Sequence, residues 1–219
     1  MTRETDIRRD SRPRPHELFR DPEQKAQIEA RNGLLQFDEV VRLIAEIEGG
    51  IKFRLRPSTI QTLHRIAIHE IYSCAGNYRR DPVVIKGTDH QPPPWEKVST
   101  FVEEMCDYIN ENWHISTPLH LAAYVMWKLN WIHPFAGGNG RTSRAVSYLL
   151  LCAKLGYRLP GSNTIPDQIV ANRQPYYQAL DAADLSFSKG VIDVSIMETF
   201  LSALLARQLS DVFRSAIES

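Results

Sequence analysis

The sequence has no excess of charge of either sign, because 26 Lys and Arg residues are balanced by 26 Asp and Glu residues. A neutral chain does not bind nucleic acid through bulk charge, so no nucleic-acid partner is expected. The sequence also lacks an apolar stretch long enough to cross a bilayer, and its N-terminus lacks the apolar stretch of a signal peptide. We therefore expect a cytoplasmic protein with no membrane-bound part.

Cysteine is scarce, since the chain has three cysteines that lie far apart. Their odd number and wide spacing form neither a disulfide framework nor a metal motif. Each is expected on a helix as a small buried hydrophobe, in a reducing compartment. Internal repeats are absent, and so is the alternation of strands and helices that builds a parallel sheet.

Most of the sequence has the apolar spacing of amphipathic helices, with buried positions at i, i+3, i+4 and i+7. Residues 1–32 are polar and are predicted to form an N-terminal arm, whereas 33–219 are predicted to form one helical domain. The predicted helices cover about 37–49, 57–71, 98–109, 118–132, 145–153, 176–183 and 194–215. The expected fold class is all-α, a helical bundle with a short β-hairpin flap.

The flap is predicted at about residues 82–94. Val83, Val84 and Ile85 indicate a short strand, and residues 86–89 have the composition of a turn. The three prolines at 92–94 exclude a long strand. This segment is therefore expected to form a short hairpin or an extended flap.

The most informative segment is 133–144, which reads His-Pro-Phe-Ala-Gly-Gly-Asn-Gly-Arg-Thr-Ser-Arg and lies between two predicted helices. Its glycines remove side chains, so main-chain N–H groups can approach a phosphate. The helix that follows directs its N-terminus at the same place. Arg141 and Arg144 are three residues apart and so share a helix face. Together these features predict a phosphate-binding cradle.

His133 stands beside this cradle and has the properties of a general base, since an unperturbed histidine titrates near the operating pH. Pro134 is expected to push His133 toward an extended conformation. Taken singly, a histidine is usually structural, a glycine-rich turn usually only turns the chain, and two arginines usually form a solvated face. Their coincidence within twelve residues favours a functional site.

Residues 133–144 resemble the signature of Fic proteins, H-P-F-x-D/E-G-N-G-R-x-x-R, and fit every fixed position but one. The resemblance extends over about 37–183 and includes the segments 75–79 and 173–180. It implies transfer of AMP from ATP to a Ser, Thr or Tyr hydroxyl of an unidentified target protein, or of the chain itself. In this resemblance His133 deprotonates the acceptor hydroxyl.

The resemblance also implies roles for the residues that bind the donor and the target. Gly138, Asn139 and Gly140 hold the α- and β-phosphates, Arg141 offsets charge on the leaving diphosphate, and Arg144 holds the γ-phosphate. Tyr177 and Asp184 border the adenine. The target segment pairs with the main chain of the flap, which comprises Val84, Ile85, Lys86, Gly87 and Thr88.

Gly137 stands where the family has an acidic residue that holds Mg²⁺ against the phosphates. Glycine has no side-chain oxygen, and Mg²⁺ requires oxygen ligands. Three alternatives remain open: slow transfer without this ligand, transfer of a different group, or a binding or regulatory relative with little catalysis. The resemblance argues against phosphotransfer, because Gly140 before Arg141 is the small residue of the AMP-transferring kind.

Residues 44–49, Ile-Ala-Glu-Ile-Glu-Gly, resemble the inhibitory motif S/T-x-x-x-E-G/N of Fic proteins, with Ile44 in place of the hydroxyl residue. In relatives with this motif, the glutamate pairs with the second arginine of the signature. The resemblance therefore implies an inhibitory pair between Glu48 and Arg144. In some relatives this glutamate instead supports removal of AMP from the target, so removal is a further alternative.

Overall fold

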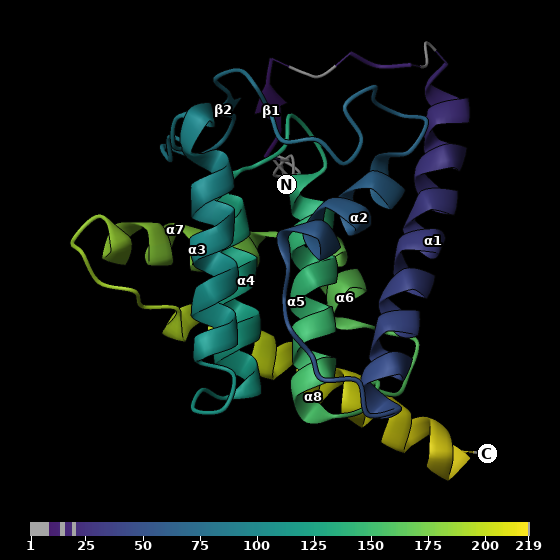
Figure 1. Cartoon of the computed structure of the whole chain (residues 1–219). Helices are drawn as coiled ribbons and strands as arrows, with labels where there is room; N and C mark the ends of the chain where they lie inside the picture. Colours follow the sequence, from purple (N-terminus) through teal and green to yellow (C-terminus); the bar gives the residue numbers. More distant parts are fainter. Residues whose placement is uncertain (1–8, 14–15, 19–20, 219) are drawn as a thin grey trace, which may run out of the picture.

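The computed structural model describes residues 9–13, 16–18 and 21–218. Within these residues the chain forms a bundle of eight α-helices and one two-stranded sheet (Figure 1). The helices are α1 Pro22–Glu48, α2 Pro57–Ile68, α3 Val98–Glu111, α4 Pro118–Ile132, α5 Asn139–Leu155, α6 Ile165–Ala171, α7 Gln174–Phe187 and α8 Ser195–Glu218. The prediction of an all-α bundle with one small β element is confirmed.

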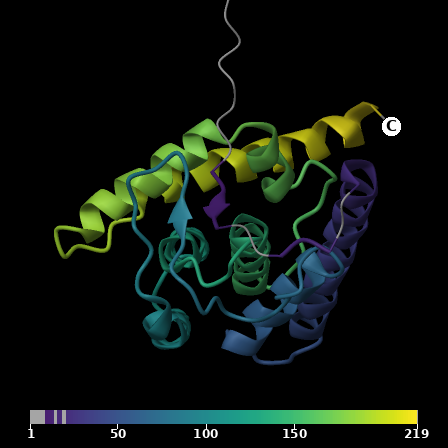
Figure 2. The ribbon, with the colours of Figure 1, turned by 90° about the horizontal axis from the view of Figure 1, so that it is seen from above.

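The centre of the bundle is the antiparallel pair α4 and α5, which the other helices surround (Figure 2). Helix α4 is apolar around most of its circumference and is buried almost throughout. It begins as predicted, with Pro118 in the first turn and the Thr117 side chain accepting a hydrogen bond from the His120 N–H. The loop 133–138 joins α4 to α5 at the end of the bundle where the two strands lie (Figure 1).

Helix α1 begins at Pro22, well before the predicted start near residue 37, so the second part of the predicted arm 1–32 is helical. Asp21 caps it by accepting a hydrogen bond from the Glu23 N–H at 3.0 Å. The buried face of α1 continues toward its N-terminus through amides, because Asn32 and Gln36 donate to main-chain carbonyls of His69 and Leu63. A prediction from the spacing of apolar residues cannot detect a buried face that is made of amide side chains.

The small sheet joins two distant parts of the chain. Strand β2 (Val84–Ile85) lies in the predicted flap, but its antiparallel partner is β1 (Ser11–Arg12), with Ser11 opposite Ile85. The second strand of the expected hairpin therefore comes from upstream. The prolines at 92–94 explain this difference, because they have no N–H to donate to a returning strand.

Smaller findings complete the fold. Helix α6 was not predicted, and the short 3₁₀-helix η1 (Trp95–Lys97) precedes α3. Cys106 and Cys152 are buried on helices as expected, whereas Cys74 is half-buried in a turn. In the described part of the chain, no helix has both the length and the apolar character that a membrane span requires.

Candidate functional site

His133 is the last residue of the turn that ends α4, and its backbone is left-handed, with φ 50° and ψ 57°. The expected extended conformation is therefore wrong. The helix C-terminus fixes this geometry, because the His133 N–H donates to the Leu129 carbonyl at 3.0 Å. The His133 carbonyl accepts from Nε of Arg79 at 2.8 Å. A non-glycine residue in this region is uncommon and is typical of functional sites.

The His133 ring has a defined proton arrangement. Nδ1 lies 3.4 Å from the Asn130 carbonyl and Nε2 lies 2.7 Å from the Ser11 hydroxyl. Because a carbonyl only accepts, Nδ1 carries the proton and Nε2 accepts the hydrogen bond of the hydroxyl. Burial lowers the pKa of His133 to about 3, so the ring is neutral at physiological pH. It therefore has the tautomer that a base acting on a hydroxyl needs.

Gly138 allows the loop to lie in close contact with α2, because it has no Cβ. Its φ is 79°, and a Cβ there would lie 2.8 Å from Cγ2 of Ile68, so no other residue fits without strain. The Asn139 side chain closes the loop, since its amide donates to the Phe135 carbonyl and its oxygen accepts from the Phe135 N–H. Asn139 and Gly140 thus present main-chain N–H groups at the N-terminus of α5.

His64 supports this loop from α2, a role that the sequence did not indicate. Its Nε2 donates to the Gly137 carbonyl at 2.9 Å, and its Nδ1 accepts from the Gly76 N–H at 3.0 Å. The ring also stacks on Phe135, with centroids 3.5 Å apart. Burial lowers the pKa of His64 to about 4, consistent with a neutral ring that donates once and accepts once.

Arg79 is the second supporting residue, and it is buried. Its guanidinium donates to the carbonyls of His133 and Pro93, and its main-chain N–H donates to the Pro134 carbonyl. It therefore holds the end of α4 and the proline segment of the flap together. No motif or periodicity marked Arg79 or His64, because both act on main-chain carbonyls of distant segments.

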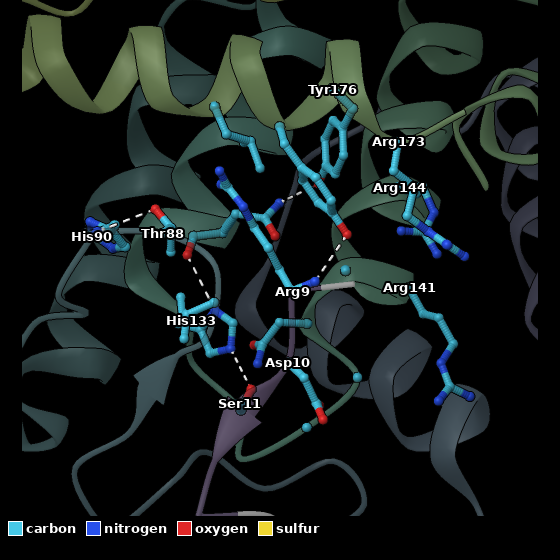
Figure 3. Close-up of a pocket in the computed structure, with 18 of the residues that line it drawn as sticks. Arg9, Asp10, Ser11, Thr88, His90, His133, Arg141, Arg144, Arg173 and Tyr176 are labelled. Carbon is cyan, nitrogen blue, oxygen red and sulfur yellow. Dashed lines mark hydrogen bonds between the residues drawn. The ribbon is translucent and has the colours of Figure 1, made fainter. Parts of the chain in front are cut away.

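Four of the described arginines line the cavity, and three of them, Arg141, Arg144 and Arg173, belong to α5 or directly precede α7. Figure 3 shows these three on one side of the cavity, with His133 and Ser11 on the other. Burial lowers the pKa of Arg144, and the positive charges of Arg173 and Arg141 lower it further. Such mutual repulsion is relieved by a bound anion, so the arrangement is suited to phosphate. The sequence motif includes the first two arginines but not Arg173.

The cavity has a volume of about 260 Å³, slightly below the range of roughly 300–1,000 Å³ usual for small-molecule sites. Tyr177 and Asp184, predicted to border the adenine, both line it. Asp184 accepts a hydrogen bond from Nε1 of Trp127 at 2.7 Å, and burial raises its pKa. The Arg9 guanidinium lies 4.6 Å from the Tyr177 ring centroid, so part of this space is already filled.

The flap contributes unevenly to the site. Ile85 and Thr88 line the cavity, whereas Val84 is about half exposed. Lys86 donates its N–H to the Asp10 carbonyl at 3.0 Å, which extends the pairing of β1 with β2. Gly87 has a φ of 80°, so it turns the chain back toward the bundle.

The predicted pair between Glu48 and Arg144 is not formed. Glu48 is the last residue of α1 and accepts a hydrogen bond from the Arg158 N–H at 2.7 Å. A different glutamate of α1, Glu29, approaches the site and pairs with Arg141 at 2.9 Å. The two glutamates are 19 residues apart, or about 28 Å along a helix, which explains why the motif near the C-terminus of α1 cannot reach the cavity.

The residues at the cradle do not fit a magnesium ion held by a side chain at position 137. Gly137 has no side-chain oxygen, and the described residues contain no cluster of three or more His, Cys, Asp or Glu suited to a metal. The groups of the site that can bind phosphates are the main-chain N–H groups at the α5 N-terminus and the arginine side chains.

Comparison with known proteins gives a family match for this architecture. Residues 54–151 match the model of the Fic/DOC family. The chain contains a Fic/DOC family domain. The matched segment runs from just before α2 into α5 and therefore includes His133 and the whole cradle.

Relatives of this Fic domain agree with the match. The chain is 31% identical over 160 residues to Protein adenylyltransferase Fic of Drosophila willistoni, covering 72% of this chain and 30% of that protein. It therefore spans less than a third of the length of this curated relative.

Solved structures share the fold. A Fic domain containing signaling protein from Bacteroides thetaiotaomicron aligns with a TM-score of 0.71 and 22% identity, over 88% of this chain and 73% of that one. The BepC protein of Bartonella tribocorum, solved with bound AMPPNP, aligns with a TM-score of 0.55 and 14% identity, over 85% and 88%.

Proposed function

We propose that this protein transfers AMP from ATP to a protein hydroxyl. One observation carries the proposal: a neutral imidazole that accepts a hydroxyl hydrogen bond at 2.7 Å shares a cavity with Arg141, Arg144, Arg173 and a helix N-terminus. The first group activates a nucleophile, and the others bind the phosphates of the donor. The relative from Drosophila willistoni is also named a protein adenylyltransferase.

The proposed chemistry is an in-line displacement at the α-phosphorus. The acceptor oxygen forms a bond to that phosphorus, its proton passes to Nε2 of His133, and the bond to the diphosphate breaks. Arg141, Arg144 and Arg173 offset the charge that develops on the leaving diphosphate. The bound phosphates also favour the protonated imidazole, so they raise the proton affinity of a ring that burial alone makes a weak base.

The identity of the donor is proposed from the residues that would contact its nucleobase. Tyr177 offers an aromatic face and Asp184 a partly buried carboxyl group, which together suit a purine with an exocyclic amine. The AMPPNP bound to BepC is an ATP analogue, which supports ATP as the ligand class for this fold.

A second candidate is a nucleotide-binding module with little catalysis. The observation that favours it is Gly137, which leaves the phosphates without a side-chain metal ligand. This candidate keeps the cradle as a binding site and removes the transfer step.

Intact mass spectrometry separates the two candidates. The protein is incubated with ATP, GTP, UTP or CTP, with and without Mg²⁺, alone and with a cell extract supplied with labelled nucleotide. We expect a mass gain of one AMP group, or labelled extract protein, with ATP in preference to the other nucleotides. Binding of ATP without any transfer would instead establish the second candidate.

Glu29 is proposed to restrain nucleotide binding, because its carboxylate occupies Arg141 at 2.9 Å. Replacing Glu29 with glutamine keeps the shape of the side chain and frees the guanidinium for phosphate. A partly exposed ion pair of this kind contributes about 0.2–1 kcal/mol, so ATP should bind up to about fivefold more tightly. Titration calorimetry measures the change. Glu48→Gln is the matched control on the same helix and should leave the affinity unchanged; equal effects of the two substitutions would contradict this role.

A further inference from the structure

The segment 9–12 crosses the mouth of the candidate site as a bound peptide would. Its residues Ser11 and Arg12 pair antiparallel with the flap strand Val84–Ile85. The Ser11 side chain is buried, and its hydroxyl hydrogen-bonds to Nε2 of His133 at 2.7 Å (Figure 3). The chain thus already holds a serine at the position that the chemistry assigns to an acceptor hydroxyl.

Contacts of the two residues that precede Ser11 fix the register of this segment. Before Ser11, the Arg9 guanidinium donates two hydrogen bonds to Asp181 on α7, at 2.6 and 2.8 Å. The Arg9 main-chain N–H also donates to the Tyr177 hydroxyl. At Asp10, the carbonyl accepts from the Lys86 N–H. A slip by one residue would break these contacts together and would turn the side chain of position 11 to the opposite face.

Ser11 is the only residue of 9–12 with a hydroxyl group, since its neighbours are arginines and an aspartate. Alternate side chains of a strand point to opposite faces. The side chain that faces His133 is therefore the one hydroxyl group in this segment, and its hydrogen bond to Nε2 of His133 places it where a base can remove its proton.

We propose that Ser11 is a self-modification site, at which the chain transfers a nucleoside monophosphate from its own bound nucleotide. This rests on the proposed function. The Ser11 oxygen forms a bond to the α-phosphorus, its proton passes to Nε2 of His133, and the α-phosphorus–oxygen bond to the leaving diphosphate breaks. The products are a Ser11 phosphodiester and diphosphate, so atoms and charge balance with the nucleoside triphosphate as the only co-reactant.

The nucleotide base has to share Tyr177 with Arg9, whose guanidinium lies over the ring. A stacked purine displaces this guanidinium, while the main-chain pairing of β1 with β2 keeps Ser11 at His133. The segment also closes the docking position of the flap to other peptides, so self-modification and transfer to another protein compete.

The test is peptide mapping by mass spectrometry after incubation of the full chain with ATP and Mg²⁺. We expect one AMP group, on Ser11. Ser11→Ala should lose at least nine-tenths of the modification, Ser11→Thr should retain it, and the exposed control Ser202→Ala should match the wild type. The rate constant should be independent of protein concentration, because donor, base and acceptor belong to one chain.

Three contradicting outcomes are distinguishable. An AMP group on another residue, or on extract protein while Ser11 stays unmodified, overturns the assignment of Ser11 and leaves the proposed function standing. No transfer to the chain or to the extract, with any of the four nucleotides, overturns both. Loss of modification in Ser11→Thr as well as Ser11→Ala, with a rate that rises with concentration, would show a modification between molecules and would also overturn the proposal.

Discussion

Replacing His133 with alanine is expected to lower the rate of AMP transfer by roughly 10²–10⁴-fold, the usual contribution of a general base. The imidazole is the group placed to remove the acceptor proton, with Nε2 2.7 Å from a hydroxyl oxygen and Nδ1 held by the Asn130 carbonyl. Nucleotide affinity should change little, because the arginines and the α5 N-terminus that bind phosphate remain.

Two measurements on the His133→Ala protein are needed: the rate of label transfer from ATP, and ATP affinity by calorimetry. The control is His114→Ala, which removes an exposed histidine outside the cavity and should behave as the wild type. A His133→Ala protein that transfers AMP at the wild-type rate would refute the assignment of the base. Loss of ATP binding as well would mean that the substitution had disturbed the cradle.

The sequence allowed prediction of those parts of the site whose residues are close together in the chain. His133 and Gly138 lie in the loop between α4 and α5, and Arg141 lies in the first turn of α5, so local chemistry sufficed to bring them together. The helices α4 and α5 were equally accessible to prediction, because apolar spacing and a Thr-Pro start signal are local features.

The supporting residues could not be predicted in this way. His64 and Arg79 act over 73 and 54 residues of sequence separation, and their partners are main-chain carbonyls. Every residue has a carbonyl, so the partner carries no sequence signal. The conformation of His133 was missed for a related reason: the effect of Pro134 is local, but the helix end and Arg79 determine the backbone.

The N-terminal segment shows a further limit. Its polar composition indicated only an N-terminal arm, yet β1 pairs with the flap and Arg9 binds α7. A strand of two residues has no periodicity to detect, and its stability comes from contacts with the finished bundle. The same limit applies to the two glutamates of α1, since only the packing of the helix decides that Glu29 and not Glu48 reaches Arg141.

Replacing Gly137 with aspartate is expected to raise Mg²⁺-dependent AMP transfer by roughly tenfold or more, because a metal bound to the phosphates stabilises the transition state by several kcal/mol. The backbone accepts the change, since Gly137 is not among the glycines with positive φ, unlike Gly138 at 79°. The hydrogen bond from His64 reaches the Gly137 carbonyl and so does not depend on the side chain.

Gly137→Asn is the matched control, because it has the same shape as aspartate without the charge that Mg²⁺ prefers. Transfer rates are compared across a Mg²⁺ titration. The aspartate protein should exceed both others at saturating Mg²⁺ and fall to or below the wild type without it, since an uncompensated carboxylate repels the phosphates. Equal rates for all three proteins would show that the missing ligand is not what limits transfer. A gain confined to Gly137→Asp would instead indicate that the arginines and the α5 N-terminus already bind the nucleotide productively, and that a single carboxylate separates this site from rapid metal-dependent catalysis.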